Sequence, residues 1–257
     1  MLNYSFIEKK ANESRIDRIT IFREYWQLLI LQRLYLTRGS ENLFFKGGTA
    51  IRFLLGSFRF SEDLDFTSTA KKIFMEKIIK EIFLYFQKNT GTPMQLKSDP
   101  VPEKFADEST RFRYLLLPPG SKQKVSIRID ISFREKPYNI EQSALIPFDY
   151  PISPYPLVTH FKPEEILAEK IRALFTRGKP RDLFDLWFLL TKNIHFDLKL
   201  INEKFKLYPH IQFSYGKLKK IIKDFDINEL KKDLNQFLPE NYRLFYQKLP
   251  QQTLELL

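Results

Sequence analysis

The chain has 257 residues, no cysteine and a formal net charge of +11, because 42 lysine and arginine residues outnumber 31 aspartate and glutamate residues. The absence of cysteine excludes disulfides and thiolate metal sites, and His160, His195 and His210 lack the spacing of zinc ligands. The positive charge indicates a polyanionic partner, with a lysine-rich composition as the alternative source of the charge.

A helix is predicted from about Ser14 to Thr37. Its most apolar part, Tyr25–Leu36, contains Gln27, Gln32 and Arg33 and is too short to span a bilayer. Charged residues occupy positions 8–10, where a signal peptide needs an apolar core. We therefore expect a cytoplasmic protein without a membrane partner.

The next segment predicts a strand, a glycine turn and a helix. Asn42–Lys46 is a short apolar run, Gly47 and Gly48 follow it, and Thr49–Leu55 has the spacing of a helix. Glycine lets the backbone approach an anion closely, and the start of a helix favours negative charge. This turn is a candidate phosphate site, although most Gly-Gly pairs are only turns.

Phe60–Thr67 predicts a strand whose two-residue period places Ser61, Asp63 and Asp65 on one face. Two neighbouring carboxylates repel each other, and a hard divalent cation relieves that repulsion. A solvated strand end is the alternative for an isolated Asp-x-Asp. The glycine turn and the aspartate pair in this order together favour a nucleotide and metal site.

A helix from about Thr69 to Lys88 precedes the rest of the sheet. Within Val125–Phe133, apolar residues alternate with polar ones, so Asp130 projects from the polar face. Asp130 is a candidate third metal ligand, or else a wet-face residue that pairs with Arg128 or another neighbour. Further strands are expected near Gln95, at Arg111–Leu117 and at Ala144–Ile146.

The proline-dense stretch Pro147–Pro163 predicts a boundary, with one domain at residues 1–155 and a helical domain at 156–257. Pro163 opens a helix in which Lys170 lies within the apolar stripe, so Lys170 must either extend its charged end to water or meet an anion. In the next helix Asp182 suits the first turn, where it complements the helix dipole. Asp185 lies deeper in an apolar helix and needs a partner, such as Lys170 or a cation-bound nucleotide.

Helices are also expected near Leu198–Tyr208, Lys217–Phe225 and Leu230–Phe237. Basic residues cluster in three places, and the cluster beside the predicted site is the best candidate for binding RNA. The lysines after position 216 suit a solvated helix face instead. The three clusters are Arg172, Arg177, Lys179 and Arg181; Lys122 and Lys124 in a predicted hairpin; and Lys217, Lys219, Lys220 and Lys223.

Two sequence blocks together resemble a known family. They are "FFKGGTAIRFLL" with "FRFSEDLDF", and "LAEKIRALFTRGKPRDLFDL" further along the chain. They are similar to the AbiEii/AbiGii-type, MenT-like toxin nucleotidyltransferases of the DNA polymerase beta-like superfamily. The resemblance implies an α+β fold, with a polymerase beta-like core of mixed sheet and flanking helices followed by a mainly helical carboxyl-terminal region.

The resemblance also implies functional roles. Gly47, Gly48 and Thr49 would hold the nucleotide phosphates, and Asp63 and Asp65 would bind Mg²⁺ or Mn²⁺. Asp130 is the candidate third ligand, at a position where relatives differ. The catalytic and nucleotide-contacting positions further along the chain are Lys170 and Asp185, with Asp182 adjacent, while Ser61 matches a hydroxyl that is phosphorylated in some relatives to silence the enzyme.

The expected reaction is attack by a hydroxyl on the α-phosphorus of a nucleoside triphosphate, with pyrophosphate leaving and two metals assisting. The resemblance makes the 3′ end of transfer RNA the leading acceptor. The enzyme would then block translation in a toxin–antitoxin or phage-defence (abortive infection) system with a cognate antitoxin protein. The alternatives are nucleotidylation or phosphorylation of a protein, which would use the same metal site, and a non-catalytic RNA-binding protein.

Overall fold

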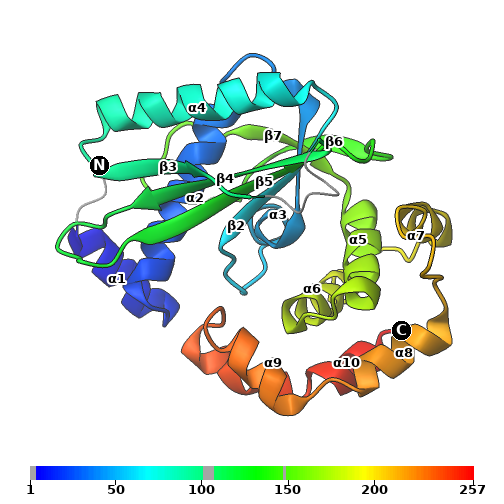
Figure 1. The fold of residues 1–257 in the computed structure, drawn as a ribbon. Coiled ribbons are helices and arrows are strands. Elements are labelled where there is room, and N and C mark those ends of the chain that lie inside the picture. Colours follow the sequence, from blue (N-terminus) through cyan, green and yellow to red (C-terminus); the bar gives the residue numbers. More distant parts are fainter. Residues whose placement is uncertain (1–3, 101–106, 147–148) are drawn as a thin grey trace. The chain divides into compact units, whose positions relative to one another are not determined.

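The structure is a computed structural model, and it describes residues 4–100, 107–146 and 149–257 (Figure 1). The chain forms two compact units. The sheet unit comprises residues 1–56 and 60–160, and the helical unit comprises residues 57–59 and 161–257. The boundary expected from the sequence was at residue 155, with residues 57–59 in the first domain.

A seven-stranded mixed sheet forms the centre of the sheet unit, in the order β3-β4-β5-β2-β1-β7-β6. Strand β2 lies antiparallel to β1 and parallel to β5, and β1 lies parallel to β7. The strands are β1 (Leu43–Lys46), β2 (Asp63–Ser68), β3 (Met94–Ser98), β4 (Ser109–Leu116), β5 (Val125–Ser132), β6 (Ile140–Ala144) and β7 (Leu157–Phe161).

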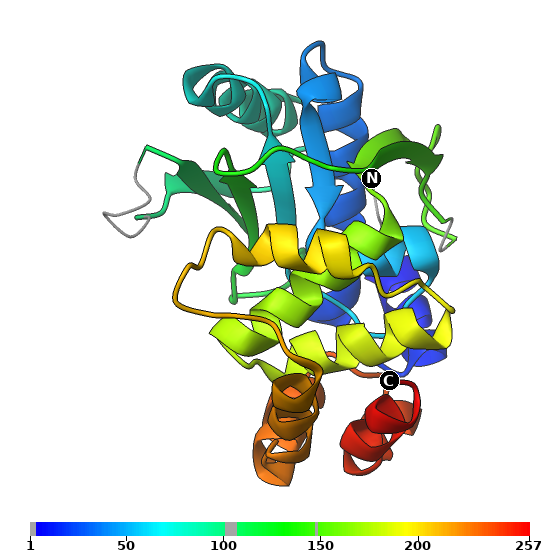
Figure 2. The same ribbon diagram turned by 90° about the vertical axis from the view of Figure 1, so that its right-hand side faces the viewer.

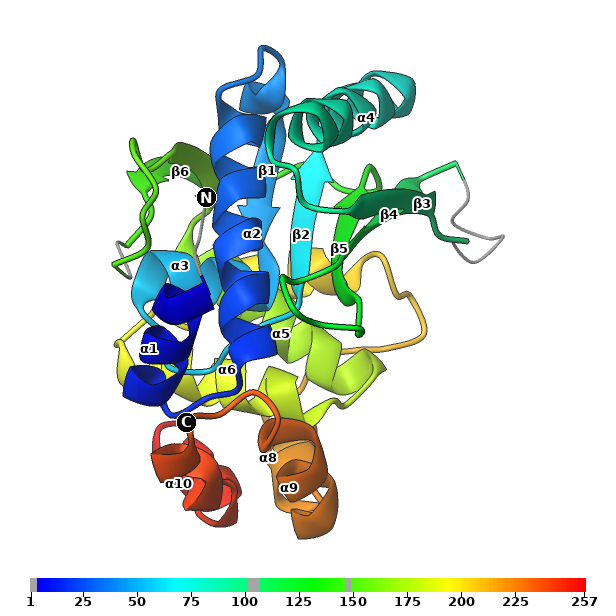
Figure 3. The ribbon, with the colours of Figure 1, turned by 90° about the vertical axis from the view of Figure 1, so that its left-hand side faces the viewer.

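Alternating burial along β4 and β5 follows the two-residue period of a strand. The sequence predicted this alternation for β5 and a strand at Arg111–Leu117 for β4. The buried side chains form one face of the sheet, and α2 (Arg18–Tyr35) and α4 (Lys72–Asn89) pack on strands β3–β5 (Figure 3). Their apolar contacts leave the other face of β4 and β5 polar and half-buried.

Three expectations about the elements need correction. The helix predicted from Ser14 to Thr37 corresponds to α2, which begins only at Arg18 because the Asp17 side chain accepts from the Thr20 amide and caps the start; the preceding helix, α1 (Tyr4–Ser14), was not predicted. The strand predicted at Ala144–Ile146 lies earlier, since β6 ends at Ala144. Strand β7 lies within the proline-dense stretch, of which residues 147–148 are outside the described part.

The helical unit places α5 (Pro163–Thr176) and α6 (Pro180–Thr191) between α7 and the remaining helices (Figure 2). Residues 57–59 join it through Phe58, whose ring stacks on Tyr242 at 4.2 Å and meets Phe184 edge-on at 5.1 Å. The other helices are α7 (Leu198–Phe205), α8 (Tyr215–Lys223), α9 (Ile227–Leu234), a 3₁₀ helix at Glu240–Gln247 and α10 (Leu249–Glu255).

The fold is α+β, with a mixed sheet and flanking helices followed by a mainly helical carboxyl-terminal region, as expected. Within the described residues, no helix is both long enough and apolar enough to cross a membrane.

Candidate active site

The glycine turn lies directly against Asp65. Helix α3 (Gly47–Leu55) begins at Gly47, whose φ of +79° is a left-handed conformation that favours glycine. A Cβ at this position would lie 2.3 Å from the Asp65 Oδ2 atom and 2.9 Å from its Cβ. Only glycine at position 47 therefore lets the backbone of the turn approach the Asp65 carboxylate this closely.

Thr49 ties the turn to strand β2. Its hydroxyl donates a hydrogen bond to the backbone carbonyl of Asp63, and its side chain is buried. Lys46 is the N-cap residue of α3, and its side chain does not accept a hydrogen bond from the first backbone N–H groups of the helix. This start can donate to an anion, as the glycine-turn hypothesis requires.

The three predicted carboxylates lie on two neighbouring strands. Asp63 and Asp65 are two residues apart on β2, and Asp65 is in register with Asp130 on β5. Paired residues of adjacent strands direct their side chains to the same face. All three carboxylates therefore share the polar face of the sheet, half-exposed, beside the glycine turn.

Two arginines lie against these carboxylates. The Arg111 guanidinium donates to the Asp130 carboxylate, and Arg128 Nη1 lies 3.6 Å from Asp63 Oδ2. Partial burial by itself lowers the pKa of Arg111, but the hydrogen bond and charge of Asp130, with Asp63 and Asp99, raise it overall. The alternative partner expected for Asp130 therefore exists, but it is Arg111 rather than Arg128.

The carboxylates of Asp63 and Asp65 suit a metal ion whose other ligands are substrate phosphates and water. Among the described residues, no three or more acidic or histidine side chains lie close enough together to hold a metal unaided. Mg²⁺ is commonly held by one or two protein carboxylates, substrate phosphates and water. Asp63 and Asp65, beside a turn that leaves room for the Asp65 carboxylate, fit that requirement.

Ser61 precedes this strand. Its backbone carbonyl accepts from the Gln27 side-chain amide at 3.1 Å, which ties the approach to β2 to helix α2. A regulatory role for the Ser61 hydroxyl stays a prediction.

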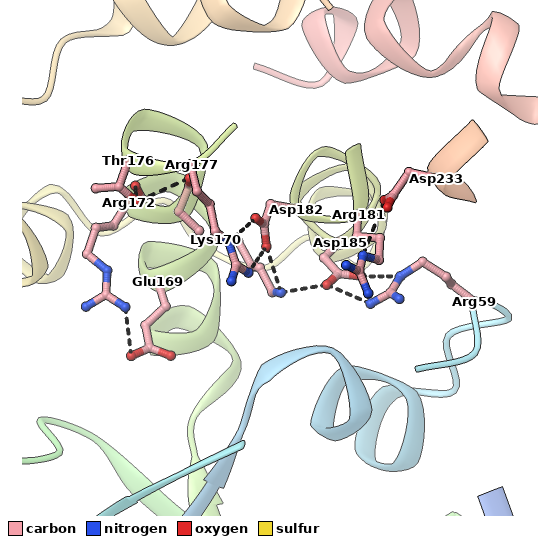
Figure 4. Close-up of polar contacts among 11 residues, drawn as sticks. Arg59, Glu169, Lys170, Arg172, Thr176, Arg177, Arg181, Asp182, Asp185 and Asp233 are labelled. Carbon is pink, nitrogen blue, oxygen red and sulfur yellow. Dashed lines mark hydrogen bonds and ion pairs between the residues drawn. The ribbon is translucent and has the colours of Figure 1, made fainter. Parts of the chain in front are cut away.

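The helical unit contains the second predicted group, shown in Figure 4. Lys170 on α5 is buried, and its Nζ lies 2.7 Å from Asp185 Oδ2 and 3.1 Å from Asp182 Oδ1, both on α6. Lys170 therefore meets anions rather than extending to water. Asp185 has the lysine partner that the sequence required, while Asp182 is an ion-pair partner and not only a first-turn residue.

Two arginines complete this network. Arg59 donates from Nε and Nη2 to the two oxygens of Asp185, both at 2.9 Å, and Arg177 donates to both oxygens of Asp182 at 2.7 and 2.8 Å. Burial opposes ionisation of Asp182, but Lys170 and Arg177 lower its pKa to about 2. Burial likewise lowers the pKa of Lys170, yet Asp185 and Asp182 raise it overall.

Three of the four predicted RNA-binding cations form ion pairs within the helical unit (Figure 4). Arg177 pairs with Asp182, Arg172 lies 3.6 Å from Glu169, and Arg181 lies 3.3 Å from Asp233. Their charges are therefore partly balanced within the chain. Lys179 is the residue that immediately precedes α6, as its N-cap.

Arg59 and Arg111 had no predicted role. Arg59 belongs to the quoted "RFSEDLDF" run, but its partner Asp185 is 126 residues away. Arg111 faces Asp130 across the β4–β5 pair, and this pairing follows only from the strand register. The sequence did place Arg111 and Arg128 on predicted strands, and these two arginines were the available indication of cations near the carboxylates.

The comparison with protein families decides the identity. The model of the family described as "Nucleotidyl transferase AbiEii toxin, Type IV TA system" matches residues 29–255. The chain belongs to this family. It is therefore a toxin nucleotidyltransferase of the type IV toxin–antitoxin class, with a nucleoside triphosphate as substrate and an antitoxin as partner.

Solved structures show the same fold. MenT4, a nucleotidyltransferase toxin from Mycobacterium tuberculosis H37Rv, is 16% identical, with a TM-score of 0.58 over 98% of this AbiEii-family chain and 99% of MenT4. JHP933 from Helicobacter pylori is 22% identical, with a TM-score of 0.55 over 94% and 93% of the two chains. A putative nucleotidyltransferase from H. pylori is 24% identical, with a TM-score of 0.55 over 90% and 92%. No curated protein sequence matches the chain significantly.

Proposed function

We propose that this AbiEii-family enzyme transfers a nucleoside monophosphate from a triphosphate to the 3′ end of an RNA, with transfer RNA as the leading acceptor. The observation that carries the proposal is the contact of the Asp65 carboxylate with Gly47, at the start of a helix whose first amides lack a side-chain cap. An uncapped helix start and a carboxylate pair therefore lie at one point of the sheet unit, which supports a nucleotide and metal site there.

The glycine turn and the aspartates of the sheet unit have different proposed roles. The amides of Gly47, Gly48 and Thr49 bind phosphate oxygens, which carry the charge that the start of a helix favours. Asp63 and Asp65 hold Mg²⁺ or Mn²⁺, which when bound neutralises charge on the phosphates. Asp130, fixed by Arg111, accepts the proton of the acceptor hydroxyl as a general base and is the candidate third ligand.

The helical unit contributes Lys170 and Asp185 as further catalytic positions. Lys170 carries a positive charge whose pKa the two aspartates raise, so it stays protonated at neutral pH and can offset charge on a triphosphate. Asp182 and Asp185 hold its ammonium group in place. Asp182 is the adjacent nucleotide-contacting candidate.

The acceptor follows from charge and family together. A net charge of +11 favours a polyanion, and an RNA fits both that charge and a toxin that blocks translation by modifying transfer RNA. Arg172, Arg177, Lys179 and Arg181 are proposed as RNA contacts in the helical unit. Their ion pairs with Glu169, Asp182 and Asp233 hold the three arginines in position.

Transfer is tested by incubating the purified enzyme with Mg²⁺, each of the four α-labelled triphosphates, total RNA and total protein. Label is expected on RNA, and within the RNA on the transfer RNA fraction. Label found only on protein would overturn the RNA acceptor and support protein nucleotidylation. RNA binding without transfer of label would support the non-catalytic alternative.

The metal-site assignment is tested by Asp65→Asn. Loss of a metal contribution of several kcal/mol corresponds to a rate reduction of roughly 10²–10³-fold. Asp107→Asn makes the same chemical change at an exposed position of the sheet unit and should keep wild-type activity. Equal activity of Asp65→Asn and Asp107→Asn would refute the metal site.

A further inference from the structure

A row of three basic side chains crosses the polar face of the sheet and leads to Asp63. Lys97 on β3 pairs in register with Arg113 on β4, Arg113 with Arg128 on β5, and Arg128 with Asp63 on β2. We call Lys97, Arg113 and Arg128 the basic row. Because paired residues share a face, all three cations lie on the face that carries the carboxylates.

The basic row is long enough for more than one phosphate. It crosses three strand-to-strand spacings of about 4.8 Å, so Lys97 and Asp63 are about 14 Å apart along the sheet. That length corresponds to at most about four nucleotides at the duplex rise of about 3.4 Å per nucleotide, and to fewer in an extended strand. The row therefore extends well beyond the glycine turn and the carboxylates.

The cations of the basic row keep hydrogen-bond donors for a ligand. The Arg128 side chain is 37% exposed, and its Nη1 lies 3.6 Å from Asp63 Oδ2. Asp99 accepts from Nε of Arg113 and pairs with its Nη2, which orients the guanidinium and leaves Nη1 for another acceptor. Lys97 is exposed and forms no ion pair with the described part of the chain.

The basic row is only one residue wide. On one side its neighbours in register are Gln95, Leu115 and Ser126, which carry no charge, and the next cation beyond them is Lys124, whose Nζ donates to Gln95 Oε1 at 3.2 Å. On the other side Arg111 is bound to Asp130, and Asp65 follows on β2. A single line of cations fits one phosphodiester backbone, whereas a duplex presents two.

We propose that the basic row binds the single-stranded 3′ end of the RNA acceptor and directs its terminal hydroxyl toward Asp63. The assignment of this strand as the acceptor rests on the proposed function. The chemistry of recognition does not, because arginine and lysine bind the phosphates of any single strand.

The experiment measures binding of a fluorescent single-stranded RNA oligonucleotide at several salt concentrations, with no triphosphate present. Each phosphate contact contributes about 0.7 to the slope of log K against log salt for single strands. Lys97→Gln should reduce that slope by about 0.7, and Lys97→Gln/Arg113→Gln by about 1.4. Lys77→Gln/Lys80→Gln on α4 removes the same charge away from the polar face and should leave the slope as in wild type.

Melting curves accompany each variant, because Arg113 also pairs with Asp99 and its loss can weaken the fold. Lys97 is exposed, so the single variant tests the row even where the double variant unfolds. An unchanged salt slope in folded Lys97→Gln would overturn the proposal. Equal effects of the row variants and the α4 variants would also overturn it, because net charge alone would then explain binding.

The labelling assay separates this inference from the proposed function. When label is transferred to RNA, Lys97→Gln should raise the KM for RNA and leave the KM for the triphosphate and kcat unchanged. A raised KM for the triphosphate instead would assign the row to the nucleotide and overturn its role as an RNA surface. Reduced salt slopes without any transfer would support the binding surface and refute the proposed transfer.

Discussion

The close approach of Gly47 to Asp65 predicts that a single methyl group disables the enzyme. In Gly47→Ala the new Cβ would lie 2.3 Å from Asp65 Oδ2 and 2.9 Å from its Cβ. Ordinary contact begins near 3.4 Å, so the carboxylate must move by about 1 Å, and rotation alone cannot relieve the contact with Cβ. A displacement of about 1 Å at a reacting centre costs about 10²-fold in rate.

Backbone strain has to be separated from this displacement. An alanine at positive φ costs roughly 1–2 kcal/mol wherever it occurs. Gly56, at the other end of α3, has φ of +73°, and the atom nearest to an added Cβ there would be Ile146 Cδ1 at 3.5 Å, an ordinary contact. Gly56→Ala therefore carries the same strain without touching the carboxylates, and it is the matched control.

The measurement is initial-rate transfer of labelled nucleotide to RNA, with urea unfolding of both variants. We expect similar losses of unfolding free energy and about a hundredfold lower activity for Gly47→Ala than for Gly56→Ala. Equal activity of the two variants would refute the reasoning, because it would show that Asp65 can move without consequence.

Three further predictions concern single contacts. Lys204→Met should lower the free energy of unfolding by about 3–5 kcal/mol, because the fully buried Glu165 carboxylate, which lies 2.7 Å from the lysine Nζ, loses that partner. The double variant Lys204→Met/Glu165→Gln should recover much of the loss, and a double variant no more stable than Lys204→Met would contradict this. The pKa of Asp182 falls from 3.8 to about 2 on folding, so its contribution of about 2 kcal/mol is present above pH 4 and lost as the pH falls toward 2. Urea unfolding between pH 5 and pH 2 should show this slope, and an equal slope in Asp182→Asn would assign it to other groups. Thr49→Val should lower the free energy of unfolding by roughly 1–3 kcal/mol and also lower activity, because the Asp63 carbonyl loses its buried donor. Thr49→Ser keeps the hydroxyl and should retain both. Equal stability and activity of the two variants would show that the hydrogen bond is unimportant.

The periodic parts of the fold were predictable from sequence because burial and period coincide there. Val125–Ser132 alternates between apolar and polar residues, and the strand lies where that alternation occurs. Helix α1 was missed, and the start of α2 was placed four residues too early, because only the cap by Asp17 marks that start. Strand β7 was missed because prolines surround it and it is only five residues long.

The candidate site was predictable in its parts but not in its pairings. The two-residue period placed Asp63 and Asp65 on one face, whereas the pairing of Asp65 with Asp130 depends on which strands are neighbours. A buried aspartate in an apolar helix predicts a cationic partner, and Lys170 is that partner for Asp185. The second cation, Arg59, comes from a loop far away in sequence, and no local pattern indicates such a contact.

The assignment of residues 57–59 to the helical unit limits how this protein can be divided. A fragment of residues 161–257 would lack Phe58, leaving a gap beside Phe184 and Tyr242. It would also lack Arg59, leaving Asp185 with only Lys170 to balance it. Excision at residue 160 should therefore yield an unstable polypeptide, and a successful minimal version would need a graft that supplies Ser57–Arg59 from a separate stretch of chain.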